Sequence, residues 1–494
     1  MSSRLADGIL PVALGAVVCA ALSYRGSPFS WRTQRNGRGA HWARRRELHR
    51  LRLDDAMPAG RLVLGTVPGL LRPGVLAAEP AQSVVVIGPT QSGKTTCLAV
   101  PAIVRWPGPV LAASVKSDLL RHTLGPRSAG GRIWCIDPTG ATGMRASTWS
   151  PLPDCRHWPG ACRVAADLTE TAKGDGTTAD GEFWFATAAK LLAPLLFAAA
   201  RGQRSMADVV RWVDTQEMAE VADQLEQAAV GQALDAARAT WCRDERTRSS
   251  VYTTAETVLA PFAQSAGAAP GLGAGPGFEP RHLFDGPHTL YLCAPAHDQR
   301  RLRGYFCALT HQVLSHAFAR ATRAGRPLDP PLLVVLDEAA HIAPLVELDG
   351  LAATCASHGI QLMTVWQDLA QVRARYGARA PTVLNNHRAK LFLPGIADPD
   401  TLEYASQLVG DEEVDHPSIT RDQRGGHSTT SSRSPRRLLP PAELRCLPRG
   451  QAVLVYDTLP PARVKLRPWA GPHGGAPVGR RLRRFRSAGP ASTH

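Results

Sequence analysis

The chain has 494 residues, a formal net charge of +15 and a hydrophobic share of 44%. This length exceeds what one hydrophobic core usually organises, so we expect two folded units with tails. Its ten cysteines include no close Cys-x-x-Cys pair with matching histidines, which argues against a zinc site and indicates buried thiols of a reducing compartment. The positive charge suits an anionic partner, either nucleic acid or a membrane surface.

The N-terminal region predicts a membrane anchor. Residues 9–24 form an apolar stretch of about 16 residues, at the short end of the ~17 to 25 that span the hydrocarbon core. Basic residues are frequent from Arg25 onward, whereas only Arg4 precedes the stretch, so the positive-inside rule predicts a single-pass protein of the inner (plasma) membrane with its bulk in the cytoplasm. A cleaved signal peptide is the alternative. We expect the anchor at 1–30 and a basic juxtamembrane linker at 31–60.

A complete phosphate-binding loop follows an apolar, β-branched run that predicts a strand over Ser83–Ile87. Backbone N–H groups of such a loop cradle the β-phosphate, Lys94 reaches the β- and γ-oxygens, and the Thr95 hydroxyl ligates Mg²⁺. The pattern therefore predicts that the chain binds ATP together with Mg²⁺. The residues expected to bind the nucleotide are Gly88, Pro89, Thr90, Gln91, Ser92, Gly93, Lys94, Thr95 and Thr96.

Residues 61–154 are expected to form the first part of a nucleotide-binding sheet. A short β-like segment at Arg61–Val67 precedes the phosphate loop, and apolar runs at Val110–Ser114 and Arg132–Ile136 predict further strands. These runs are continuous rather than alternating, which is typical of parallel strands buried on both faces. The fold class is accordingly α/β.

Between 155 and 285 the apolar spacing becomes helical. We expect a strongly apolar helix over 183–196, an amphipathic helix over Met206–Gln227 and another helix over Ser249–Phe262. Because this block separates the two halves of the sheet, it predicts an inserted all-α domain.

The second part of the sheet is expected at 286–420, beginning with a strand at His288–Cys293. Farther along, an apolar run ends on Asp337 and Glu338. Ligands of doubly wound sheets lie outside the carboxyl ends of the strands, so Asp337 is expected beside Thr95, holding Mg²⁺ through a water. Glu338 is expected to polarise the attacking water, which indicates ATP hydrolysis and not binding alone.

A third strand, predicted over Ile360–Gln367, ends on an amide. Gln367 could sense the γ-phosphate or orient the water and convey that state to the surface. The residues expected to act in catalysis are therefore Lys94, Glu338 and Gln367.

The C-terminal region divides into three segments. Residues 421–440 are rich in Ser, Arg and Gly and predict a flexible basic linker. Residues 441–470 are expected to hold a terminal β-hairpin, with strands at Gln451–Tyr456 and Arg463–Leu466. Residues 471–494 form a basic tail.

Several short motifs accompany the phosphate loop in a characteristic order. They are Val115–Asp118, Cys135–Gly140, Trp149–Leu152, Gly181–Trp184, Leu369–Gln371, Asn385-Asn386 and Gly395–Pro399. With these motifs the chain resembles, over about residues 62–414, the coupling-protein ATPases of conjugative and type IV secretion systems. The resemblance implies a RecA-like P-loop NTPase core with an inserted all-α domain and assembly into a hexameric ring. It also implies work on DNA, or on a relaxase–DNA complex, in contact with relaxosome and secretion-channel proteins at the membrane.

One position departs from the family pattern, and two other functions stay open. The family often has an arginine shortly before the strand that leads to the glutamine, whereas this chain has Cys355–Gly359 there. Arg375 and Arg388 are the nearest substitutes. The alternative functions are a chromosome-segregation DNA translocase of the FtsK or HerA type, and a nucleotide-gated membrane adaptor that recruits secreted protein cargo.

Overall fold

The computed structural model describes residues 39–469 apart from 54–59, 69–72, 116, 174–177, 266–276, 296, 343–344, 346 and 422–426. The expected membrane anchor at 1–30 and the basic tail at 471–494 therefore lie outside the described residues. The same holds for parts of the expected juxtamembrane linker at 31–60. The described residues form two units, one made of residues 40–411 with 437 onward, and the other containing 412–436.

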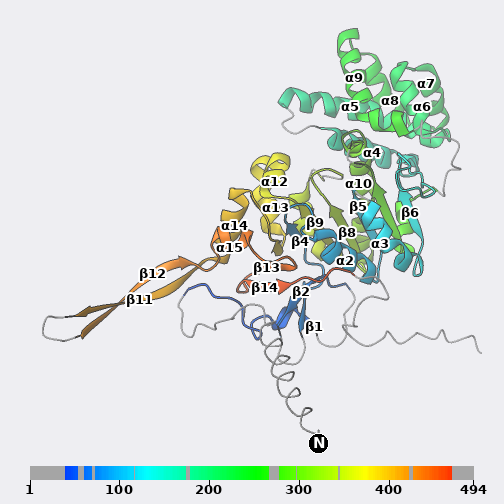
Figure 1. Cartoon of the computed structure of the whole chain (residues 1–494). Helices are drawn as coiled ribbons and strands as arrows, with labels where there is room; N and C mark the ends of the chain where they lie inside the picture. Colours follow the sequence, from blue (N-terminus) through cyan, green and yellow to red (C-terminus); the bar gives the residue numbers. More distant parts are fainter. Residues whose placement is uncertain are drawn as a thin grey trace, which may run out of the picture. The chain divides into compact units, whose positions relative to one another are not determined.

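A mixed sheet forms the centre of the larger unit (Figure 1). Within the described residues its strand order is β1-β3-β2-β14-β13-β10-β4-β9-β8-β5-β7-β6. The strands from β10 to β6 run parallel to one another, whereas those from β1 to β13 pair antiparallel. The strands are β1 (Arg52–Leu53), β2 (Val63–Val67), β3 (Gly74–Ala77), β4 (Val84–Ile87), β5 (Val110–Ser114), β6 (Ile133–Ile136), β7 (Thr289–Cys293), β8 (Leu332–Asp337), β9 (Ile360–Trp366), β10 (Ala389–Phe392), β13 (Gln451–Tyr456) and β14 (Ala462–Lys465).

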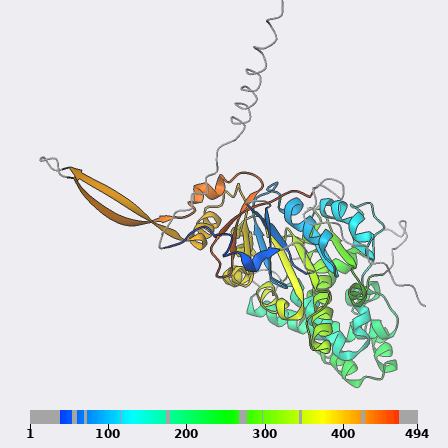
Figure 2. The same cartoon turned by 90° about the horizontal axis from the view of Figure 1, so that it is seen from below.

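Helices cover both faces of this sheet (Figure 2). The α-helices of the larger unit are α2 (Val100–Arg105), α3 (Ser117–Ser128), α4 (Trp158–Ala172), α5 (Ala179–Arg201), α6 (Met206–Asp214), α7 (Ala219–Gln227), α8 (Gly231–Trp241), α9 (Glu245–Ser265), α10 (Gln299–Ala324), α11 (Leu348–Thr354), α12 (Leu369–Tyr376), α13 (Ala380–Asn386), α14 (Pro399–Val409) and α15 (Pro441–Arg445). Shorter helical turns are η1 (His49–Leu51), η2 (Thr95–Ala99), η3 (Leu152–Arg156), η4 (Pro280–Asp285), η5 (Cys355–His358) and η6 (Gly377–Arg379).

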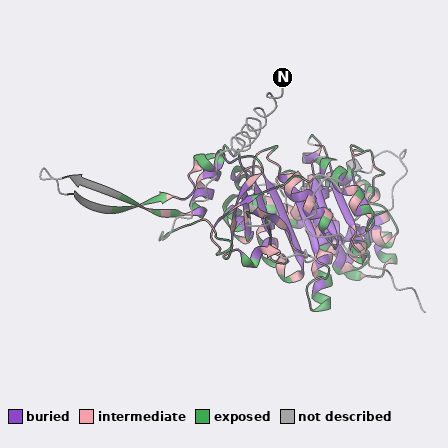
Figure 3. Ribbon diagram, turned by 60° about the horizontal axis from the view of Figure 1, so that its bottom comes forward, coloured by how far each residue is buried: buried purple, intermediate pink, exposed green. Residues whose placement is uncertain are grey.

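Strand β4 shows how the sheet divides two hydrophobic cores. Val84 and Val86 belong to a core that includes residues of α2 and α3, whereas Val85 and Ile87 belong to the core that includes residues of α10. Successive side chains of a strand point to opposite faces, so a continuous apolar run is what a strand buried on both faces requires. Figure 3 shows the buried residues following the strands through the interior.

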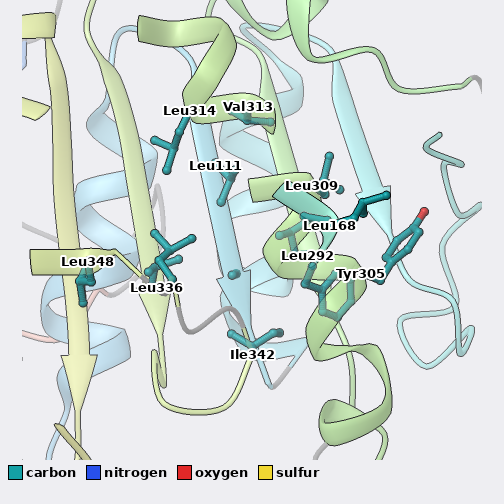
Figure 4. Close-up of a cluster of buried hydrophobic side chains, with 14 of the residues drawn as sticks. Leu111, Leu168, Leu292, Tyr305, Leu309, Val313, Leu314, Leu336, Ile342 and Leu348 are labelled. Atoms are coloured by element: carbon teal, nitrogen blue, oxygen red, sulfur yellow. The ribbon is translucent and has the colours of Figure 1, made fainter. Parts of the chain in front are cut away.

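The core on the α10 face continues into the helical block. Figure 4 shows Leu111 and Leu336 of the sheet with Leu309 of α10 and Leu168 of α4 in one cluster of buried side chains. The same cluster extends to buried residues of α5, such as Leu191. Helices α4 to α9 lie between β6 and β7 in the chain. The domain boundaries expected from the sequence stay a prediction.

Helix α5 is the one described helix that is long and apolar enough to cross a membrane, over Asp180–Arg201. Of its apolar window, 61% is buried inside the protein. Its burial in the shared core accounts for this apolar character, so the helix is weak evidence for a membrane span.

The helix expected over Met206–Gln227 is wrong, because the structure has α6 and α7 there with a turn between them. Gln216 adopts a left-handed backbone with φ of 50°, and the Glu217 carboxylate accepts hydrogen bonds from the N–H groups of Ala219 and Glu220 at 3.0 and 3.1 Å. This side-chain cap starts a new helix without any glycine or proline. The apolar spacing continues across the turn, so the pattern did not indicate that the helix is interrupted there.

The flexible linker expected at 421–440 is also wrong over its described part. Residues Asp411–Arg421 form β11 and His427–Arg437 form β12, and the two strands make a separate two-stranded sheet. The Arg433 guanidinium pairs with the Asp415 carboxylate at 2.9 Å, and Arg436 pairs with Glu412. Opposite charges on facing strands stabilise such a pair. The basic residues of β12 therefore pair with acidic residues of β11.

We expect the buried imidazole of His387 to make the protein less stable in acid. His387 is fully buried, and its Nδ1 donates to the Val383 carbonyl at 2.7 Å, so in the neutral ring Nε2 accepts from the Thr364 hydroxyl at 3.1 Å. Burial lowers its pKa to about 4. Since the unfolded side chain has a pKa near 6.5, the unfolded state binds more protons between these values. The free energy of unfolding should fall by on the order of 3 kcal/mol as pH drops across this window.

Urea unfolding at a series of pH values measures this effect, with His387→Gln as the comparison. The variant should lose that part of the pH dependence, whatever its absolute stability. An unchanged pH slope in the variant would assign the acid sensitivity to other groups.

Candidate nucleotide-binding site

The parallel strands bring the predicted site residues to one edge of the sheet. In the register of β4 with β9, Ile87 pairs with Trp366, and in that of β5 with β8, Ser114 pairs with Asp337. The carboxyl ends of β4, β5, β8 and β9 therefore meet at this edge. Asp337 is the last residue of β8, and the phosphate loop, Glu338 and Gln367 directly follow strands that end there.

The phosphate loop leaves β4 through a tightly packed backbone. The Gly88 N–H donates to the Trp366 carbonyl at 3.1 Å, and the Ser92 hydroxyl donates to the Pro89 carbonyl at 2.7 Å. Gln91 and Gly93 have φ of 60° and 93°, in the left-handed region. This arrangement turns the loop into the helical turn η2, which continues as α2.

Gly88 is required by close packing, which gives a testable prediction. A Cβ at this position would lie 2.8 Å from the Cβ of Leu393. Gly88→Ala should therefore displace the loop, lowering stability by about 1–3 kcal/mol and ATP-analogue affinity by at least ~10-fold. Thermal unfolding and fluorescent-nucleotide titration measure these changes. Gly350→Ala in α11, where a Cβ would meet nothing within 4 Å, is the matched control. Equal nucleotide affinity in Gly88→Ala and wild type would contradict the packing argument.

Lys94 is folded over the loop. Its side chain is buried, with 7% exposure, and its ammonium group donates to the Pro89 carbonyl at 2.8 Å and to the Gly88 carbonyl. The backbone carbonyls therefore hold the buried ammonium group inside the loop that the sequence pattern predicts to bind phosphates.

Asp337 lies at the centre of the site. The Thr95 hydroxyl is 3.0 Å from one carboxylate oxygen and 3.2 Å from the other, and the Ser114 hydroxyl donates at 3.4 Å. Asp337 is 5% exposed, and burial is the main cause that raises its pKa. The negative charge of Glu338 adds to the rise, while the Thr95 hydrogen bond and the charge of Lys94 oppose it. Ser114 was not predicted, although a polar residue ending a buried strand was a usable signal.

The donor set around Asp337 fits Mg²⁺. Thr95 and Asp337 offer oxygen ligands, which this cation prefers, and a nearby dication would relieve the cost of the buried carboxylate. Across the described part of the chain, no group of three or more His, Cys, Asp or Glu side chains is placed to hold a metal. Mg²⁺ usually takes one or two protein ligands and completes its shell with phosphates and water.

Glu338 has a backbone conformation that the sequence did not reveal. Its φ is 65°, in the left-handed region that costs a non-glycine residue about 1–2 kcal/mol. The conformation is held by its neighbours, because the Ala339 N–H donates to the Val365 carbonyl at 3.1 Å and the His341 N–H donates to the Glu338 carbonyl at 2.9 Å. The side chain is half-buried. Strain of this kind, fixed by surrounding structure, points to a functional position.

Gln367 lies between the end of β9 and the start of α12. Its N–H donates to the Gln371 side-chain oxygen at 3.0 Å, and Asp368 caps α12 by accepting from the Gln371 N–H at 2.9 Å. The residue is therefore held by a local network at the same edge as Asp337 and Glu338.

The two arginines considered in place of the family's arginine lie on different elements. Arg388 directly precedes β10, at the amino end of that strand, and its carbonyl accepts from the Asp457 N–H at 3.2 Å. This end is opposite to the phosphate loop within one protomer. Arg375 lies in the last turn of α12, within electrostatic reach of Cys307 of α10.

Comparison with known proteins identifies the family. Residues 48–469 match the family model for type IV secretory system conjugative DNA transfer proteins. The chain belongs to this family. It is 25% identical over 404 residues to the conjugal transfer protein TraG of Escherichia coli, covering 74% of this chain and 62% of that protein. It is 24% identical over 408 residues to VirD4 of Agrobacterium fabrum, covering 77% of this chain and 57% of that protein. The chain thus spans less than two thirds of the length of either relative.

Solved structures share the fold. The plasmid coupling protein TrwB in complex with ADP and Mg²⁺ superimposes with a TM-score of 0.64 at 19% identity, covering 92% of this chain and 98% of TrwB. TrwB with a non-hydrolysable ATP analogue gives the same TM-score at 20% identity. The coupling protein and this chain therefore share an α/β P-loop NTPase fold with a large mixed sheet.

Proposed function

We propose that this protein is an ATP hydrolase that couples nucleotide turnover to the transfer of DNA, or of a relaxase–DNA complex, into a conjugative type IV secretion channel. The observation that carries the proposal is the buried Asp337, hydrogen-bonded to Thr95 of the phosphate loop and followed by the strained Glu338. A site for nucleotide binding alone has no need of the second carboxylate.

Each site residue has a distinct task in this proposal. The loop 88–96 binds the phosphates of ATP, with Lys94 neutralising charge on the β- and γ-oxygens. Thr95 and Asp337 would hold Mg²⁺, and the bound cation would neutralise charge on the transferring phosphate. Glu338 orients and polarises the attacking water, and Gln367 reports the state of the γ-phosphate to α12. The complexes of TrwB with ADP and Mg²⁺ and with an ATP analogue support the binding of nucleotide and Mg²⁺.

The assembly is proposed from the family. The names of TraG and the family description support conjugative DNA transfer as the setting. In that setting we expect a RecA-like core, a hexameric ring, and contacts with the relaxosome and with channel proteins. The apolar stretch 9–24 would anchor the chain in the inner membrane, with its bulk in the cytoplasm.

DNA-stimulated ATP hydrolysis tests the proposal. Steady-state turnover of the full chain is measured without DNA, with single-stranded DNA and with duplex DNA, over a series of salt concentrations. We expect DNA to raise turnover, and salt to abolish the effect because phosphate contacts release counterions. Tight ATP binding with no turnover in any condition would instead favour the nucleotide-gated adaptor.

A further inference from the structure

A cavity lies at the edge of the sheet opposite to the phosphate loop. It has a volume of about 600 Å³ and is lined in part by Pro109, Gly286 and Pro330. These residues precede β5, β7 and β8, so the cavity lies at the amino ends of the parallel strands. A six-residue strand such as β8 spans roughly 20 Å, which separates this cavity from the nucleotide edge.

Three arginines line this cavity: Arg320 and Arg323 in the last turns of α10, and Arg326 just after it. All three are exposed. In the described part of the chain, no carboxylate lies within 4.0 Å of any of their guanidinium groups. Some exposed arginines of the larger unit are paired, as where Arg204 and Arg211 both contact Glu220 at 3.2 and 2.8 Å. The cavity therefore gathers three guanidinium groups that have no carboxylate within 4.0 Å among the described residues.

The helix end explains only part of this arrangement. The negative end of α10 favours nearby cations, and the Arg323 Nε donates to the Ala319 carbonyl at 3.2 Å. Arg326, however, lies beyond Gly325, the left-handed residue that ends the helix. Neither the negative end of α10 nor the hydrogen bond to Ala319 requires three arginine side chains around one cavity. Guanidinium groups bind phosphate oxygens in a bidentate geometry, so their convergence suits a phosphate.

Two carboxylates narrow the ligand class. Asp285 and Asp329 also line the cavity, and they would repel a bare anion such as inorganic phosphate. They can accept hydrogen bonds from the amino group of a base. A volume of about 600 Å³ lies within the range of small-molecule sites. Cationic and carboxylate groups together in such a space match a nucleotide, which carries both a phosphate and hydrogen-bond donors.

We propose that this cavity binds a nucleotide unit of a nucleic acid strand, with its phosphate on Arg320, Arg323 and Arg326. This inference rests on the proposed function, since DNA is the cargo that would supply the strand. It adds a contact surface outside the ATP site, at the opposite edge of the sheet. A free nucleotide offers the same chemistry, so the experiment must separate the two sources.

Binding of labelled oligonucleotides to the full chain tests the site. The double variant R320A/R323A should weaken binding of single-stranded DNA by about 10-fold at low salt and reduce the slope of log affinity against log salt by about 1.5. R201A/R246A removes the same charge from exposed positions of α5 and α9 and is the matched control. ATP-analogue binding at the phosphate loop should be unchanged in both variants, which verifies folding. R320K/R323K should keep the slope but lose affinity, because lysine cannot form bidentate contacts.

Each outcome supports or overturns the proposed nucleotide site. Wild-type oligonucleotide binding by R320A/R323A would overturn the inference and leave the proposed function standing. Failure of the wild type to bind DNA at all would overturn both. Mononucleotide titration into the Lys94→Ala chain addresses the source: binding that persists there and vanishes on adding R320A/R323A, together with wild-type oligonucleotide binding by R320A/R323A, would assign the cavity to a free nucleotide and exclude the strand.

Discussion

Replacing Glu338 by glutamine is expected to lower ATP turnover by about 10²–10⁴-fold while ATP affinity stays nearly unchanged. Glutamine keeps the size of the side chain but cannot take a proton from the attacking water. Glu338 follows Asp337 directly, and its left-handed backbone is fixed by hydrogen bonds at Ala339 and His341. These contacts involve the main chain only, so the substitution should leave the geometry of the site intact.

Single-turnover hydrolysis and fluorescent-nucleotide binding separate the two effects of this variant. Glu347→Gln is the matched control, because Glu347 is an exposed residue that directly precedes α11, a short way along the chain. Its turnover should equal that of wild type. Normal turnover by Glu338→Gln would move the general base to another residue and remove the main reason for proposing hydrolysis.

Lys94→Ala is expected to reduce ATP affinity by about 10²–10³-fold. A hydrogen bond to a charged group contributes about 1.5–3 kcal/mol, and Lys94 is expected to make such bonds to both the β- and γ-phosphates. Its ammonium group is already buried within the loop, held by the carbonyls of Gly88 and Pro89. Little reorganisation is therefore needed to place this positive charge at the phosphates. A surface residue cannot supply the charge once Lys94 is removed.

Equilibrium titration with a fluorescent ATP analogue measures this loss. Lys190→Ala, at an exposed position of α5, removes the same charge far along the chain and should bind as wild type does. Wild-type affinity in Lys94→Ala would mean that the loop 88–96 does not hold the phosphates.

The sequence predicted the sheet that carries the site because its central strands are continuous apolar runs. The runs predicted to end at Ile87, Ser114, Asp337 and Gln367 correspond to β4, β5, β8 and β9, of which β9 ends one residue earlier, at Trp366. Strand β10 was missed: Ala389–Phe392 has only four residues and includes Lys390, whose ammonium group donates to the His387 carbonyl at 2.7 Å. A short strand with a charged residue gives too little periodicity to be distinguished from a loop.

Two features of the site depended on contacts between distant segments. The pairing of β5 with β8 places Ser114 beside Asp337, and no local pattern encodes that register. The left-handed backbone of Glu338 likewise depends on the Val365 carbonyl of β9. Local spacing predicts which residues end a strand, whereas neighbouring strands determine how those residues are oriented.

Movement along DNA is the central property of the proposed function. We would measure displacement of a third strand from a triplex by the purified full chain with ATP, with a non-hydrolysable analogue, and with the Glu338→Gln variant. Displacement that requires ATP and is lost both with the analogue and in the variant is the predicted result. Displacement at an equal rate by the variant, or none by a wild type whose ATP turnover is stimulated by DNA, would contradict the proposed function.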